Sequence, residues 1–187
     1  MNAQQRRIDL LTQLLEAQTR RADRLEHESL TDPLTGLHNR RAFDRKVQKL
    51  QLEDTTFTVV LIDMANLKAA NEKLGHAGAD DILVQVANCL RREDMVARIG
   101  GDEFAVVLPG DAGPSVRDRI ERSFDAVELG PRVSIFLVAA LGQWNPGMQF
   151  RDVLIRADKA LEARKLKLKV ARGEVTTREE ALKAVAS

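Results

Sequence analysis

The sequence predicts an α/β-type domain in which helices cover a central sheet. The first observation is a set of apolar runs typical of buried strands: FTVVLID (57–63), EFAVVLP (103–109) and RVSIFLVAAL (132–141). The second is that segments with helical spacing lie between these runs. The third is size, because 187 residues with 44% hydrophobic side chains suit one domain of ordinary size with an appendage.

The remaining elements follow from local patterns. Helices are predicted at 39–51, 65–75, 79–92, 114–127 and 150–165. The segment MVARIG (95–100) is predicted to pair with 103–109 as a hairpin joined at Gly100-Gly101-Asp102. LKLKV (166–170) alternates apolar and charged residues, which predicts an edge strand protected by lysines. Thr177 and Glu180 form a capping-box pattern, which predicts a short last helix.

The N-terminal segment differs from the rest because residues 1–30 contain neither Gly nor Pro. Apolar residues and one Gln recur in heptads, at Ile8, Leu15 and Ala22 and at Leu11, Gln18 and Leu25. This pattern favours a parallel two-stranded coiled coil that would make a homodimer, and the alternative is a helix that packs on its own domain. Pro33 and Gly36 then end the helix. We therefore expect an N-terminal helix at 1–30, a globular domain at 31–172 and a helical tail at 173–187.

Composition narrows the classes of protein. The net charge of +1 does not indicate a nucleic-acid partner or an anionic membrane surface. No apolar run reaches the roughly 18 residues of a membrane span, and the N-terminus lacks the apolar core of a signal peptide, so we expect a cytoplasmic protein without membrane insertion. The single cysteine, Cys89, excludes a disulfide framework, and its apolar surroundings predict a core residue rather than a reactive thiol.

Three carboxylates fall where strands end. Asp63 closes an apolar strand, and Asp102 and Glu103 lie at the tip of the predicted hairpin. Clustered carboxylates raise one another's pKa unless a cation neutralises them, and Mg²⁺ or Mn²⁺ suits an all-oxygen site. Such an ion handles nucleotide triphosphates, and Gly100 and Gly101 would permit positive φ and the approach of a bulky ligand. The alternative is an ordinary Gly-Gly-Asp turn beside a strand-capping Asp.

The same residues resemble the GGDEF family, the diguanylate cyclases. GGDEF stands unaltered at 100–104, and three further segments match in order: DPLTGLHNRRAF (32–43), LIDMANLKAANEKLGHAGADDIL (61–83) and, more loosely, RADKALEARK (156–165). The likeness covers about residues 31–170. It implies a fold like the palm of adenylyl cyclases, with a central mixed sheet flanked by helices. It also implies condensation of two GTP into cyclic di-GMP with release of two pyrophosphates, by a homodimer that holds one GTP per subunit.

The resemblance assigns roles to individual positions. Asp63, through its carboxylate, and Met64, through its backbone carbonyl, would bind the metal together with Asp102 and Glu103, and Asp102 and Glu103 would be the catalytic pair. Asn71 and Asp80 match the residues that read guanine, although a helix-surface Asn and a helix-capping Asp are the plainer interpretations. The remaining GTP-binding positions would be Leu67, Lys68, Gly100, Gly101, Lys165 and Lys169.

An Arg-x-x-Asp pattern precedes the hairpin, at Arg91 and Asp94. In the family this is the site at which cyclic di-GMP inhibits the enzyme, because Arg can stack on guanine and pair with phosphate while Asp accepts from the base. A charged helix end is the plainer interpretation of the same letters. Arg98 would support this product site or hold the hairpin.

The chain departs from the family pattern in several places. Ala65 replaces a frequent acid, Leu67 a usual aromatic, Phe136 a usual Gly and Glu162 a usual Tyr. The segment Leu168-Lys169-Val170 replaces a usual Gly-Arg-Asn, and Lys169 lacks the bidentate geometry of Arg. We expect an active cyclase of reduced strength. The alternative is a weak or inactive module that binds GTP or cyclic di-GMP and signals to a protein partner.

Overall fold

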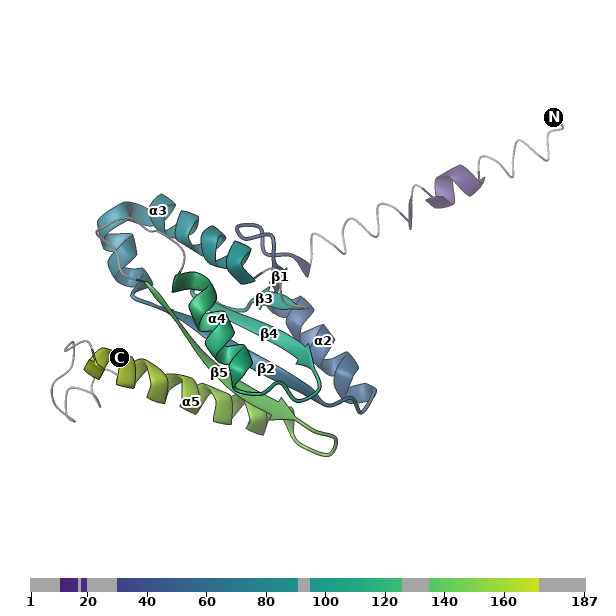
Figure 1. Ribbon diagram of the computed structural model, residues 1–187. Coiled ribbons are helices and arrows are strands. Elements are labelled where there is room, and N and C mark those ends of the chain that lie inside the picture. The colour runs from purple at the N-terminus through teal and green to yellow at the C-terminus, as the bar shows by residue number, and fades with distance from the viewer. Residues whose placement is uncertain (1–10, 17, 20–29, 91–94, 126–134, 172–187) are drawn as a thin grey trace.

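The structure is a computed structural model, and it describes residues 11–16, 18–19, 30–90, 95–125 and 135–171. Helices flank a five-stranded sheet with strand order β1-β3-β4-β2-β5 (Figure 1). The strands are β1 (His38–Asn39), β2 (Phe57–Ala65), β3 (Val96–Arg98), β4 (Glu103–Pro109) and β5 (Phe136–Trp144). The helices are α2 (Arg40–Leu52), α3 (Leu67–Leu90), α4 (Ser115–Asp125) and α5 (Phe150–Ala171). The predicted central mixed sheet with flanking helices is confirmed.

The sheet is built around β2. This strand pairs antiparallel with β4 from Phe57 to Asp63 and antiparallel with β5 from Phe57 to Ala65. Strands β3 and β4 form the predicted hairpin, and the short β1, which the sequence did not predict, pairs parallel with β3. A strand covered on both faces is apolar throughout, which explains why β2 has no alternation of apolar and polar residues.

Each face of the sheet has its own apolar core. On one face Val60, Ile62 and Phe104 pack with residues of α3 and α4 such as Val86 and Ile120. On the other, side chains of β2, β4 and β5 pack with α2 and α5, among them Val59, Leu61, Phe43, Val153 and Leu161. The sheet is therefore a middle layer, and its strand ends open between helices of the two outer layers.

Two predicted elements differ from the structure. The two helices predicted at 65–75 and 79–92 are described as one element, α3 (Leu67–Leu90), whose helix is broken at Gly75 (φ 72°, ψ 176°), and residues 91–92 lie outside the described residues. The predicted edge strand 166–170 is wrong, because this segment is the last part of α5. Leu and Lys are strong helix formers, and Leu168 packs against the core shared with α2, so helix continuation outweighs a five-residue alternation. The predicted strand 132–141 is described only from residue 135, and β5 covers 136–144.

The N-terminal segment is described only in part. Residues 11–16 and 18–19 are helical, and Leu11, Leu14 and Leu15 are exposed. Ile8, Ala22, Leu25 and the predicted tail helix at Thr177 and Glu180 lie outside the described residues. Cys89 is partly buried against the α3 core. Among the described residues, no helix combines the length and apolarity that a bilayer crossing needs.

Gly142 in β5 lets α5 approach the sheet, and we predict that Gly142→Ala lowers the free energy of unfolding by about 1–3 kcal/mol. A Cβ there would lie 2.8 Å from Val153 Cγ1 and 3.2 Å from the carbonyl oxygen of Val153. Chemical denaturation measures the change. Gly113→Ala is the matched control, since its Cβ meets open space, and it should leave stability unchanged or raise it by up to about 1 kcal/mol. Equal stability of the two variants would contradict the prediction.

Candidate functional site

The predicted acids lie together at one end of the paired strands β2 and β4. Asp63 and Glu103 are register partners in the β2–β4 ladder, and the backbone N–H of Met64 donates to the carbonyl of Asp102 at 3.1 Å. Asp63 is almost entirely buried, with 7% of its surface exposed, while Asp102 is partly buried and Glu103 is exposed. The ladder itself therefore fixes where these three residues stand.

The glycines of the hairpin do not have the backbone conformation expected of them. Neither Gly100 nor Gly101 has a positive φ, so the predicted need for left-handed backbone is wrong. A Cβ on Gly100 would collide with the carboxylate of Glu103, which folds back over it, whereas a Cβ on Gly101 would meet open space. The turn closes through the N–H groups of Ile99 and Gly100, which both donate to the Glu103 carbonyl at 2.9 and 3.3 Å.

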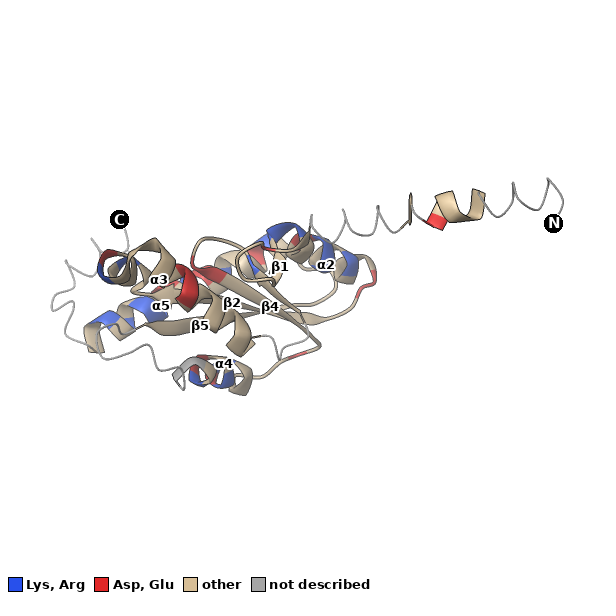
Figure 2. Cartoon of the chain, turned by 90° about the horizontal axis from the view of Figure 1, so that it is seen from above, with Lys and Arg blue, Asp and Glu red and all other residues tan. Residues whose placement is uncertain are grey.

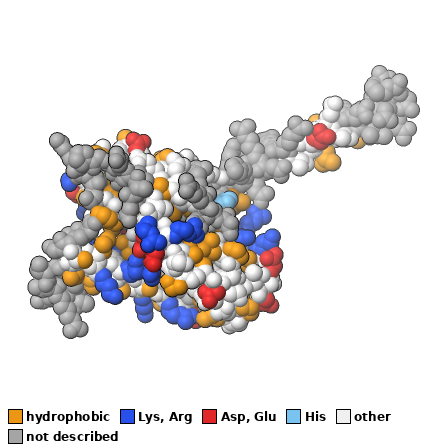
Figure 3. Space-filling model, in the orientation of Figure 1, with side chains coloured by type: hydrophobic (Ala, Val, Ile, Leu, Met, Phe, Trp, Pro, Cys, Tyr) orange, Lys and Arg blue, Asp and Glu red, His pale blue; other side chains and the backbone are white. Residues whose placement is uncertain are grey.

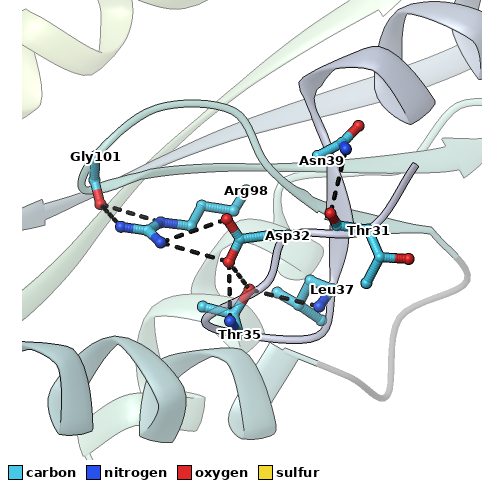
Figure 4. Close-up of polar contacts among 7 residues, drawn as sticks. All are labelled: Thr31, Asp32, Thr35, Leu37, Asn39, Arg98 and Gly101. Carbon is cyan, nitrogen blue, oxygen red and sulfur yellow. Dashed lines mark hydrogen bonds and ion pairs between the residues drawn. The ribbon is translucent and has the colours of Figure 1, made fainter. Parts of the chain in front are cut away.

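A guanidinium ties the hairpin to the turn that precedes β1 (Figure 4). Arg98 Nη2 and Nε donate to the carbonyl oxygen of Gly101 at 2.7 and 3.2 Å. Its Nη1 lies 3.4 and 3.5 Å from the two carboxylate oxygens of Asp32. Of the two roles predicted for Arg98, the structure shows the one in which it holds the hairpin.

The turn at 31–39 is itself held by Asp32. The Thr35 N–H and hydroxyl donate to Asp32 Oδ1 at 2.8 and 2.7 Å, and Gly36 takes the left-handed conformation (φ 65°) that the turn requires. Burial alone raises the pKa of Asp32, but the hydrogen bonds from Thr35 and the charge of Arg98 outweigh it and hold the pKa below its ordinary value. Asp32 and Thr35 were missed as site residues, and only the DPLT letters hinted at them.

The buried Asp63 has a cation beside it. Lys165 Nζ lies 2.8 Å from Asp63 Oδ2 and 2.9 Å from Glu162 Oε1. Burial raises the pKa of Asp63, the Lys165 ammonium opposes that rise, and the charges of Asp102 and Glu162 add to it. On balance the pKa of Asp63 is raised, so its surroundings disfavour the charged carboxylate, and a further positive charge nearby would stabilise it.

A cavity of about 530 Å³ opens at these strand ends. Asp63 and Asp102 contribute carboxylates to its wall, and three lysines from α3 and α5 face them: Lys68, Lys165 and Lys169. The turn from β2 into α3 forms the floor, where Asn66 adopts positive φ (73°), a conformation that Asn tolerates. Carboxylates next to lysines suit a polyphosphate carried by a divalent cation.

A second cavity of about 390 Å³ continues the first. The two share Leu67, Lys68 and Asp102, and the second adds Asn71, His76, Asp80, Arg98 and Gly101. The side-chain oxygen of Asn71 is buried and makes no hydrogen bond within the described structure. A buried polar atom without a partner is costly unless a ligand or water satisfies it, so this end of the groove lacks a hydrogen-bond donor.

The donor set fits a hard cation only after rearrangement. Asp63, Asp102, Glu103 and the Met64 carbonyl are all oxygen donors, as Mg²⁺ or Mn²⁺ prefers. Within the described ranges, however, no three His, Cys, Asp or Glu side chains gather as a ready-made metal site. Glu103 lines a separate, mostly apolar cavity beside Phe43 and Leu61, and the Asp63 carboxylate already forms an ion pair with Lys165. Binding an ion therefore requires Glu103 to turn and Lys165 to withdraw.

Other predicted residues fall outside this groove. Arg91 and Asp94 lie outside the described residues. Gly100 lines neither cavity of the groove. Phe136, which stands in place of a usual Gly, pairs with Ala65 across β5 and β2 and lines a different cavity from the two of the groove. Glu162 was not predicted as a site residue, although it departs from the family pattern. It accepts a hydrogen bond from Lys165 and so contacts the site directly.

Charges on the surface are mixed in sign. Basic residues recur along α5 and α2, and acidic ones stand at the strand ends and on α3 (Figure 2). On the face shown in Figure 3, basic and acidic side chains lie side by side among apolar ones rather than forming one basic surface. This distribution agrees with the net charge of +1.

Comparisons with known proteins agree on one family. The family described as "Diguanylate cyclase, GGDEF domain" matches residues 29–169. YtrP of Bacillus subtilis is 33% identical over 150 residues, which cover 76% of this chain and 26% of that protein. Diguanylate cyclase DgcM of Escherichia coli K12 is 31% identical over 157 residues, covering 77% of this chain and 38% of DgcM. The chain thus spans only a minor part of these two relatives.

Solved structures give the same result. The crystal structure of the coiled coil and GGDEF domain of DgcB from Caulobacter crescentus, in complex with c-di-GMP, superposes with a TM-score of 0.76 at 26% identity. The match covers 88% of this chain and 95% of the DgcB chain.

We predict that Asp32→Asn lowers the free energy of unfolding at pH 7 by about 1–3 kcal/mol, because charge-assisted hydrogen bonds from Thr35 and Arg98 are lost. A carboxyl whose folded pKa is depressed contributes stability above its unfolded pKa of about 3.9 and loses it as pH falls through the folded value. The gap between wild type and variant should therefore close in acid, which denaturation at several pH values measures.

The matched control is Asp44→Asn, which removes an exposed i,i+4 pair with Arg40 and should change stability by less than about 1 kcal/mol. A gap for Asp32→Asn that is unchanged from neutral to strongly acidic pH would contradict the prediction.

Proposed function

Since this chain belongs to the GGDEF family of diguanylate cyclases, we propose that it condenses two GTP into cyclic di-GMP and releases two pyrophosphates. One observation carries the proposal: the carboxylate and lysine cavity lies next to the cavity of Asn71 and Asp80, and the two share the lining residues Leu67, Lys68 and Asp102. A groove with phosphate chemistry at one end and base chemistry at the other fits a single nucleoside triphosphate.

Guanine suits the second cavity. Its Watson–Crick edge carries N–H and NH₂ donors, and the sugar-facing side of the ring carries an acceptor. The exposed carboxylate of Asp80 can accept hydrogen bonds from these donors. The side-chain oxygen of Asn71, which has no hydrogen-bond partner, can accept one more. Adenine lacks an N–H at the ring position between these groups, so the donor and acceptor set favours GTP over ATP.

The first cavity supplies the chemistry of phosphoryl transfer. Asp63, Asp102, Glu103 and the carbonyl of Met64 would hold Mg²⁺ or Mn²⁺, and the ion would supply positive charge to stabilise the leaving pyrophosphate. Asp102 accepts the proton of the attacking ribose 3′-hydroxyl, with Glu103 beside it. Lys68, Lys165 and Lys169 neutralise the triphosphate, and the bare Gly101 leaves room for the nucleotide against the hairpin.

The reaction needs two chains, because each groove accommodates one nucleotide and the product joins two. Exposed leucines at positions 11, 14 and 15 support a homodimer through the N-terminal helix. We further propose that cyclic di-GMP binds a second site that includes Arg91, Asp94 and Arg98, and that it inhibits the enzyme there.

A second candidate function has its own observation. The Lys165 ammonium pairs with the Asp63 carboxylate, and Glu103 faces a separate cavity. The acids must therefore rearrange before they can act in catalysis. Lys169 also stands where Arg is usual. A chain that cannot complete this rearrangement would bind GTP or cyclic di-GMP and pass the signal to a protein partner.

We predict that purified protein with GTP and Mg²⁺ forms cyclic di-GMP, and that Asp102→Ala reduces the rate about a hundredfold or more because the proton acceptor is lost. Product is measured chromatographically across a protein dilution series, and the rate per chain should fall as the dimer dissociates. Asp111→Ala, an exposed acid in the loop after β4, is the control and should retain full activity. A dimeric protein that binds GTP and forms no product would instead favour the binding module.

We predict that added cyclic di-GMP slows the wild-type enzyme and that Arg91→Ala relieves this inhibition, because a guanidinium that pairs with phosphate is removed. Initial rates at several product concentrations measure the effect. Arg92→Ala is the neighbouring control outside the Arg-x-x-Asp pattern. Wild-type rates that do not respond to added cyclic di-GMP would contradict the proposed inhibition and leave the proposed catalysis unaffected.

A further inference from the structure

Glu162 contacts a residue of the site but has no role in the proposed reaction. It precedes by one helical turn the part of α5 that lines the first cavity, and its Oε1 lies 2.9 Å from Lys165 Nζ. The same Nζ lies 2.8 Å from Asp63 Oδ2. One ammonium thus bridges two carboxylates, of which only Asp63 is needed to bind a cation.

The bridge keeps Lys165 charged and in place. Burial lowers the pKa of Lys165, but hydrogen bonds and charges from Asp63 and Glu162 outweigh this and raise it above its ordinary value. The ammonium therefore stands as an internal counter-ion where a substrate complex would bring its own cation. The cavity is neutralised by the chain itself.

Binding of a nucleotide must undo this arrangement. When a metal ion takes Asp63, and phosphate takes Lys165, the carboxylate of Glu162 is left without its partner next to a polyanion. Both the lost ion pair and the remaining negative charge oppose binding. A tyrosine, usual in the family at this position, has no negative charge at neutral pH and cannot hold a lysine in this way.

We propose that Glu162 weakens the affinity of this groove for a nucleoside triphosphate by holding Lys165 in an ion pair that the triphosphate must break. The inference rests on the proposed function in one respect, namely that the groove takes GTP. Lys165 and Glu162 are 24% and 39% exposed, so their interaction is partly screened and its effect on affinity is about two- to fivefold.

The test is GTP binding to the full chain by titration calorimetry, first in metal-free buffer with chelator and then with Mg²⁺. Glu162→Gln should lower the Kd for GTP about two- to fivefold in both buffers. Asp158→Asn, which removes the same charge from α5 one turn earlier, should leave the Kd unchanged. In steady-state kinetics Glu162→Gln should lower KM more than it changes kcat.

A double-mutant cycle separates an ion pair from a general charge effect. Lys165→Met should weaken GTP binding, and in that background Glu162→Gln should lower the Kd by clearly less than it does in the wild type, because only the repulsion between Glu162 and the triphosphate is then left to remove. An equal gain with and without Lys165, an equal gain in Asp158→Asn, or unchanged or weaker binding by Glu162→Gln overturns the inference. Absence of GTP binding by the wild type overturns the proposed function, and the inference with it, whereas binding with no Glu162 effect overturns the inference alone.

Discussion

The antiparallel pairing of β2 with both of its neighbours is the constraint on which the rest of the structure depends. Seven register pairs join β2 to β4 and nine join it to β5. A one-residue slip would exchange the two faces of the strand and move Asp63 from the α5 side to the α3 side. Because the apolar side chains of β2 fill separate cores above and below, that slip is strongly disfavoured, and the acids stay at one edge.

Charge balance follows from that position. A carboxylate fixed at the end of a buried strand must be neutralised, protonated or paired with a cation. Here Lys165 pairs with it, and the raised pKa of Asp63 shows that the pairing does not fully offset burial. A site in this condition favours incoming cations over anions at Asp63 and anions over cations at the lysines. The two preferences together suit a polyphosphate that carries its own cation.

Much of this was predictable from the sequence, and the exceptions have physical causes. Apolar runs located β2 and β4, and the order of motifs located the acids, because both signals are local. Residues 166–170, near the end of α5, were mistaken for a strand because five residues carry too little periodicity to outweigh helix propensity. The Asp32–Arg98 contact joins residues 66 positions apart, and the Glu162–Lys165–Asp63 bridge depends on how α5 lies on the sheet. No pattern within one segment reports such contacts.

Helix α5 is held near its C-terminal end by ion pairs as well as by the packing of Leu168 against the core. Its fully buried side chains, Val153, Ala157 and Leu161, all precede Glu162. Beyond them, Lys165 pairs with Asp63 on one side, and Arg164 Nη2 lies 2.7 Å from both oxygens of Glu121 on the other. Glu121 also accepts from the N–H of Ala139 in the edge strand β5, which joins this pair to the sheet. If Lys165 left Asp63, the contact between Arg164 and Glu121 would still join α5 to α4 and, through Glu121, to β5.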